Sequence, residues 1–227
     1  MRYRILFIVC TFALFCGGTV HATALSGTFI MSGNFSITSS SVSFSSPTDV
    51  SDQFALSLGT GSFVGLDGTN DVNSISGAVG TLFPATVFVT FPLTTDPSLN
   101  LDMIAAGIDP STDCPVGPAS GQICTPASGL LHMLNLQNTA LGSDASWVVT
   151  GVTSDGLSSW TAIFTAQFLV PYQTVLGDIA SGQAIYAYSA TVDVTPDVSP
   201  TPEPGTLVML GSGLLGVAGL IRRKARL

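Results

Sequence analysis

The chain has almost no basic residues. Its six lysines and arginines lie at positions 2, 4, 222, 223, 224 and 226, so none lies between Ile5 and Ile221. The formal net charge of the whole chain is −8, and the central region is more acidic still because the positive charges sit at the two ends. A region without cations cannot attract nucleic acid or anionic lipid through Coulomb forces, clamp a phosphate or form a lysine Schiff base. We therefore expect no nucleic-acid partner.

Other catalytic groups are scarce as well. His132 is the one histidine outside the N-terminal segment, and it lies in the apolar, strand-like run 130–134, where a structural role is commoner than a catalytic one. The sequence contains no Gly-x-Ser-x-Gly elbow and neither of the motifs Asp-Thr-Gly and Asp-Ser-Gly. Two aspartates could still hydrolyse a glycoside, but no spacing marks a pair as partners. We expect that the protein is not an enzyme.

Short stretches in which large and small side chains alternate dominate the region from Leu25 to about residue 195. Such alternation in β-branched and aromatic residues is typical of half-buried strands. Four stretches show it: Phe54–Leu58, Ala85–Phe91, Trp160–Phe168 and Tyr186–Val194. Period two places Val87, Val89 and Phe91 on one face, and Trp160, Phe164 and Phe168 on one face of their own strand.

The predicted fold is therefore all-β: an antiparallel, jelly-roll-like β-sandwich spanning residues 25–195. One short helix is expected over 174–181, where Val175, Leu176 and Ile179 have helical spacing and Gly182 provides a C-terminal stop.

Two cysteines remain in the central region, Cys114 and Cys124. In an exported, oxidising setting two cysteines form a disulfide by default. A metal or redox pair is the alternative, and the missing Cys-x-x-Cys spacing argues against it. We predict a disulfide that closes the short loop between them.

From Asp67 to Asn73 every second residue carries a side-chain oxygen: Asp67, Thr69, Asp71 and Asn73. Oxygen ligands at every second position are what a calcium-binding loop requires. However, the sixth position is Val72 and the twelfth is Ala78, where a calcium loop has Gly and Glu. We expect no cofactor and keep two interpretations of this segment open: an Asx-rich turn, or a calcium site formed by Asp67, Asp71 and Asn73.

Both ends of the chain have the features of export signals. At the N-terminus Arg2 and Arg4 precede an apolar run and a small-x-small cleavage site, which predicts a signal peptide and its helix over residues 1–24. At the C-terminus a Pro-rich stalk (196–204) precedes the uncharged run 206–221 and a basic end. Sixteen helical residues span about 24 Å, which predicts a short transmembrane helix within an anchor and basic tail over 205–227.

This tail resembles the PEP-CTERM sorting segment of Gram-negative bacteria. The resemblance rests on its three-part order: the tripeptide Pro202-Glu203-Pro204, the apolar run, and the basic residues Arg222, Arg223, Lys224 and Arg226. It implies an exosortase-type processing enzyme as partner, transit through the inner membrane as a temporarily anchored protein, and delivery to the cell surface or extracellular space. It covers only the last 26 or so residues and implies nothing about the central domain.

Two functions fit this sequence. One is a structural or interaction protein of the cell surface or extracellular matrix, favoured by the missing catalytic groups. The other is a module that binds surface polysaccharide or calcium, favoured by the predicted sandwich and the segment around Asp67. The exposure of the aromatic side chains distinguishes them, because sugar-binding modules present exposed aromatic rings whereas a structural domain buries its rings in the core.

Overall fold

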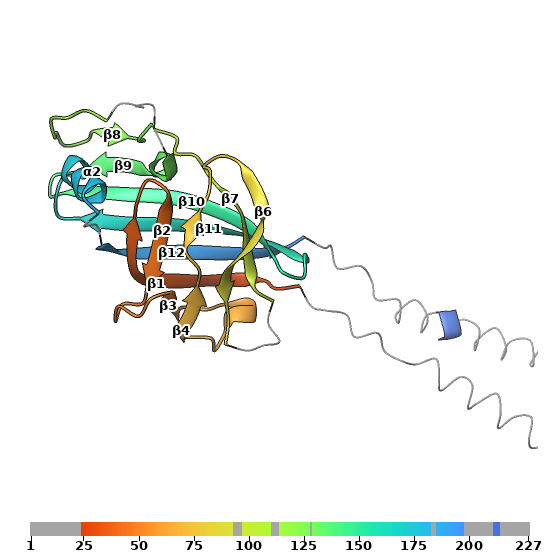
Figure 1. The fold of residues 1–227 in the computed structure, drawn as a ribbon. Helices are drawn as coiled ribbons and strands as arrows, with labels where there is room; N and C mark the ends of the chain where they lie inside the picture. The colour runs from red at the N-terminus through yellow and green to blue at the C-terminus, as the bar shows by residue number, and fades with distance from the viewer. Residues whose placement is uncertain are drawn as a thin grey trace, which may run out of the picture. The chain divides into compact units, whose positions relative to one another are not determined.

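The computed structural model describes residues 24–92, 97–109, 114–127, 129–182, 185–197 and 211–213, apart from the side chain of residue 83. Residues Ala24–Asp197 form one compact unit (Figure 1). The predicted signal helix and the predicted transmembrane helix lie outside the described residues, except for residues 211–213, which are helical. The limits of the signal peptide, domain, stalk and anchor stay predictions.

The compact unit is built almost entirely from β-strands. They are β1 (Gly27–Ile37), β2 (Ser41–Ser45), β3 (Gln53–Ser57), β4 (Gly68–Val72), β5 (Ile75–Ser76), β6 (Leu82–Thr90), β7 (Leu99–Ile104), β8 (Ile123–Cys124), β9 (Asn135–Asn138), β10 (Ser143–Thr153), β11 (Ser158–Phe168) and β12 (Ile185–Pro196). Helical segments are η1 (Gly61–Phe63), η2 (Gly129–Met133) and α2 (Tyr172–Ala180). The prediction of an antiparallel all-β fold with a short helix is confirmed.

Eight of the strands close into a ring. Their order around it is β1, β3, β4, β6, β7, β10, β11 and β12, and β12 pairs with β1 again. Every neighbouring pair is antiparallel. The order follows the chain, because each strand of the ring pairs with the next ring strand along the sequence, whereas a jelly roll has crossing connections. Strands β2 and β5 extend from β1, and β9 and β8 extend from β10.

The inward-facing side chains of this ring fill its interior. Along β11 every second residue is buried, including Trp160, Phe164 and Phe168, as the alternation predicts. Aromatic rings from different strands meet in the core: Trp147 stacks on Phe164 with ring centroids 5.0 Å apart, and Phe44 of β2 lies 5.8 Å from Phe164. Burying each such side chain contributes about 2–3 kcal/mol to folding, so the ring holds a packed core.

Strand β6 departs from the predicted alternation. Its pairing with β7 shifts register between Val87 and Val89, which is the mark of a bulge. Phe88 therefore turns inward and is 2% exposed, whereas Val87, which we predicted to share a face with Val89, is 40% exposed. Phe88 then stacks on Trp160 with ring centroids 5.7 Å apart. A local irregularity in pairing thus overrides the period of two.

Helix α2 covers one end of the ring (Figure 1). Its buried residues Val175 and Ile179 are two of the three that helical spacing assigned to one face, and Leu176 packs against the core beside them. Gly182, with a φ of 74°, ends the helix in the left-handed region, as expected. Among the described residues, no helix has the length and apolar character needed to cross a membrane.

Candidate functional site

The first and last residues of the compact unit leave it at the same end of the sheet. Ser158 Oγ donates to the carbonyl of Leu25 at 2.8 Å, and the backbone N–H of Asp197 donates to the carbonyl of Leu157 at 2.9 Å. The sequence continues from here toward the predicted sorting residues, which lie outside the described part of the chain: Pro202, Glu203, Pro204, Arg222, Arg223, Lys224 and Arg226. The individual role of each stays a prediction.

The segment considered for calcium is a strand rather than a loop. Asp67 precedes β4, Asp71 lies within it and Asn73 follows it, and all three are exposed. Alternate residues of an extended strand stand about 6.6 Å apart on one face, so their oxygens form a row instead of a shell around one ion. In the part of the chain that the structure describes, no three His, Cys, Asp or Glu side chains gather closely enough to hold a metal ion.

Cys114 and Cys124 form a disulfide, and their Cα atoms lie 5.3 Å apart. Cys124 is fully buried in β8, and Cys114 packs against the core. The residues between them, by contrast, are mostly exposed, and Val116 is 92% exposed. The disulfide therefore fixes both ends of a protruding loop, residues 115–123, called here the disulfide loop.

Three side-chain amides hold the disulfide loop in place. The Nδ2 of Asn138 donates to the Oε1 of Gln122 at 3.1 Å and to the Oε1 of Gln173 at 3.0 Å. Gln173 in turn donates to the carbonyl of Pro115 at 3.0 Å. The Oδ1 of Asn138 accepts from the backbone N–H of Tyr172 at 2.9 Å, which satisfies a free donor at the start of α2. Asn138 thus joins β9, the disulfide loop and the helix.

Sequence reasoning did not identify this amide network. Asn138 is 16 residues from Gln122 and 35 residues from Gln173. Nothing local marks the three as partners, since single amide residues occur throughout polar segments. Only the pairing of β8 with β9 and the return of the chain through α2 bring them together.

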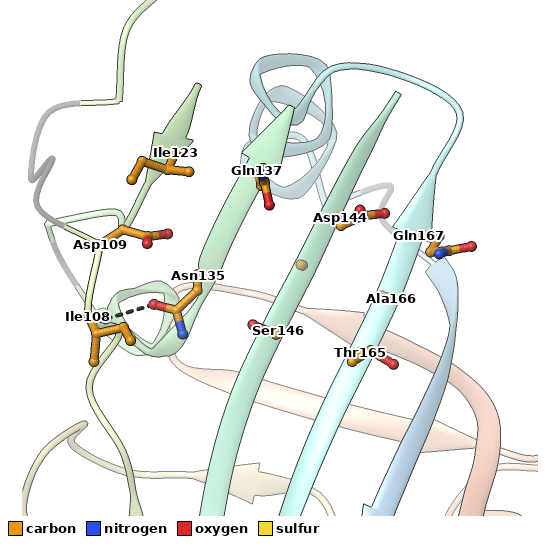
Figure 2. Close-up of a pocket in the computed structure, with 11 residues that line it drawn as sticks. Ile108, Asp109, Ile123, Asn135, Gln137, Asp144, Ser146, Thr165, Ala166 and Gln167 are labelled. Carbon is orange, nitrogen blue, oxygen red and sulfur yellow. Dashed lines mark hydrogen bonds between the residues drawn. The ribbon is translucent and has the colours of Figure 1, made fainter. Parts of the chain in front are cut away.

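A shallow cleft of about 480 Å³ lies on the outer face of β9, β10 and β11 (Figure 2). Its floor holds two rows of polar side chains in register across the strands: Gln137, Asp144 and Gln167, then Asn135, Ser146 and Thr165. Ile108 and Asp109 form one wall, where the backbone N–H of Ile108 donates to Asn135 at 2.7 Å. Burial raises the pKa of Asp109.

The chemistry available in this cleft is hydrogen bonding. None of its lining residues is a histidine, lysine, arginine or cysteine. Its hydroxyls therefore have no neighbouring base of the kind that activates a serine nucleophile. The cleft can hold a polar molecule through its amides and through the carboxylates of Asp109 and Asp144.

His132 has a structural partner. It lies in η2, a 3₁₀-helix, and not in the strand-like run that its apolar neighbours suggested. Its Nδ1 is 2.9 Å from the carbonyl of Pro126, so the ring N–H donates to that oxygen. This bond fixes the ring at the base of a loop.

The burial of the aromatic side chains argues against sugar binding. Among the aromatic side chains that the structure describes none is exposed: Tyr186 is half-buried, and the others, including Trp147 and Tyr172, are buried. Sugar-binding surfaces use exposed aromatic rings as stacking platforms. The buried rings therefore favour a structural or interaction domain over a polysaccharide-binding module.

No curated protein and no solved structure matches this chain. The model of one family, the PEP-CTERM protein-sorting motif, matches residues 200–224. This match includes the tripeptide at 202–204 and three of the four basic residues after the apolar run. The C-terminal tail of this chain is therefore a PEP-CTERM sorting motif, which implies exosortase-dependent sorting to the cell surface or extracellular space.

Proposed function

We propose that this protein is an exported structural or interaction protein of the cell surface or extracellular matrix of a Gram-negative bacterium, and that it is not an enzyme. The observation that carries the proposal is the sorting motif at 200–224. The motif follows the β domain closely, because the last strand of the sheet ends at Pro196. An N-terminal signal peptide directs export, and an exosortase-type enzyme of the inner membrane processes the tail.

The domain itself supports a non-catalytic role. It has no lysine or arginine, and its one histidine is held by a backbone carbonyl. Its described aromatic rings fill the core instead of forming a binding platform. Hydrophobic burial, a closed ring and a disulfide make a compact body suited to an extracellular environment.

Intact-mass measurement of the protein recovered from the cell surface tests the sorting. We expect a species that begins near Leu25 and lacks most or all of the chain after Pro204. A double substitution, Pro202→Ala with Pro204→Ala, should leave the tail attached and the protein in the membrane fraction. The matched control is Pro200→Ala, which changes a neighbouring proline outside the tripeptide and should be processed normally. A dominant mature species that retains residues 222–227 would contradict the proposal.

A further inference from the structure

The end of the domain that lies far from both chain ends carries exposed apolar side chains. In the pairing of β10 with β11, Ser143 is opposite Phe168 at this end, whereas Val152 is opposite Ser159 at the other. The strands β8 and β9 and helix α2 cluster here, and the described chain ends leave the compact unit at the opposite end (Figure 1). Three apolar side chains are almost fully exposed here and are called the distal patch: Val116 (92%), Leu141 (87%) and Leu169 (93%).

A cleft lies beside the distal patch. It measures about 400 Å³ and lies between the disulfide loop at Pro118–Ser120 and the β9–β10 turn at Asn138–Gly142, with Pro171 also in its lining. None of its lining residues is charged. Asn138 contributes to this lining and is the residue whose amide holds the disulfide loop and α2 together. Both walls are therefore fixed before any partner arrives, which lowers the entropy cost of binding.

We propose that the distal patch and its cleft form a contact between two copies of this chain. Val116 or Leu141 of one copy enters the cleft of the other, and the reverse contact forms at the same time. A knob and a hole on the same surface satisfy the requirement of a two-fold interface, in which one patch meets itself. Burying apolar side chains supplies the free energy.

Charge selects a second copy over a basic partner. The domain carries thirteen aspartates and no lysine or arginine, so two copies repel each other over most of their surfaces. They approach with less repulsion where the surface is uncharged, and the distal cleft has an uncharged lining with exposed apolar side chains beside it. A basic protein would instead be drawn to the aspartates elsewhere on the domain. Pairing at this end leaves the chain ends of both copies on the sides of the dimer away from the contact.

The strength of this contact should depend on salt concentration in a characteristic way. Screening weakens the repulsion between the two negative domains and leaves apolar burial intact, so association should tighten as salt increases. Contacts between opposite charges behave in the reverse way. The inference goes beyond the proposed function, and its test does not depend on the tail-processing test, because one measures association and the other the mass of the tail.

Sedimentation velocity of the purified exported protein, from about 0.05 M to about 1 M NaCl, is the experiment. We expect a dimer whose dissociation constant falls as salt rises. Val116→Asp and Leu141→Asp should each raise this constant about tenfold or more, which corresponds to at least about 1.4 kcal/mol. Both side chains are almost fully exposed, so folding should be unaffected, which circular dichroism verifies.

The matched control is Val64→Asp. Val64 is 70% exposed and follows η1, whose Ser62 bonds to Ser26 near the start of the domain, far from the distal patch. It adds the same charge and should leave the dissociation constant unchanged. A monomer at every salt concentration overturns the proposal. A dimer that responds equally to Val64→Asp and Val116→Asp overturns it too, and so does association that weakens as salt rises.

Discussion

Replacing Asn138 with aspartate should destabilise the domain strongly, although the two side chains have the same shape. Asn138 is only 3% exposed. Its Nδ2 donates two hydrogen bonds, to the amide oxygens of Gln122 and Gln173. Aspartate keeps the bond from the N–H of Tyr172 but turns both donor contacts into contacts between oxygens. Neither glutamine can rotate its amide to compensate without losing its own bond to the backbone of the disulfide loop.

The size of this effect follows from the two hydrogen bonds that the substitution removes and from the charge that it introduces. Two hydrogen bonds contribute about 1 kcal/mol each, and placing a buried charge against unpaired acceptors adds about 1–3 kcal/mol. We expect Asn138→Asp to lower the free energy of unfolding by about 3–5 kcal/mol near neutral pH. Because burial and facing acceptors raise the folded-state pKa of the new carboxyl above the unfolded value near 3.9, the destabilisation should shrink as pH falls toward that value. The protonated carboxyl can then donate again.

A neighbouring residue on the same strand provides the control. Asn135 uses its Oδ1, which accepts from the N–H of Ile108 at 2.7 Å and from Thr125 Oγ1 at 3.4 Å. Asn135→Asp keeps both bonds, so its cost should stay below about 1 kcal/mol. Urea unfolding, followed by the fluorescence of the buried Trp147 and Trp160, measures both variants at several pH values. Equal destabilisation of the two variants, or a destabilisation by Asn138→Asp that does not change with pH, would refute this account of the network.

Four further substitutions test the fold. Cys114→Ala should lower the free energy of unfolding by about 2–3 kcal/mol, and the exported wild-type protein should show no free thiols in a titration without reductant. Gly151→Ala should cost about 3 kcal/mol or more in urea unfolding, because a Cβ there would overlap a backbone oxygen of β7 and the ring of Trp160. Gly177→Ala in α2, where a Cβ meets open space, should instead stabilise by up to about 1 kcal/mol. Burial, together with Asp178 beside its hydroxyl, raises the pKa of Tyr186 to about 12. The free energy of unfolding should therefore fall as pH rises above about 10, where the unfolded phenol ionises. Tyr186→Phe should reduce this fall in a denaturant series taken to alkaline pH.

The strands with strict alternation could be predicted because burial on one face leaves a period of two in the sequence. In β11 and β12 this pattern is continuous over many residues, and the structure follows it. In β6 it fails, since the bulge near Phe88 depends on how the strand pairs with β7 and not on its own composition. The closure of the ring depends on the pairing of β1 with β12, from Gly27 opposite Val194 onward. No local pattern encodes a contact between the two ends of a domain.

The candidate site divides in the same way. The sorting motif is a continuous stretch with a fixed order of charge and apolar character, so the sequence alone was sufficient to find it. The disulfide followed from the count of cysteines and the setting. The amide network around Asn138 and the distal patch depend on which loops meet at one end of the ring. For Asp67, Asp71 and Asn73 the calcium interpretation stays a prediction, and because β4 is extended the spacing of these residues in the sequence does not by itself bring their oxygens together.

The absence of lysine gives the closed ring a further role. Sheet proteins commonly protect exposed edge strands from pairing with other chains by placing lysine on them. This domain has none, but closing eight strands into a ring removes most of its edges. The outermost strands of the two extensions, β5 (Ile75–Ser76) and β8 (Ile123–Cys124), are each two residues long, too short to serve as a template. Cys124 also ties β8 to the disulfide loop. An anionic domain without lysine or arginine can thus avoid edge-to-edge aggregation through its topology. Two copies of the domain can then associate through side-chain surfaces such as the distal patch, and not through backbone pairing.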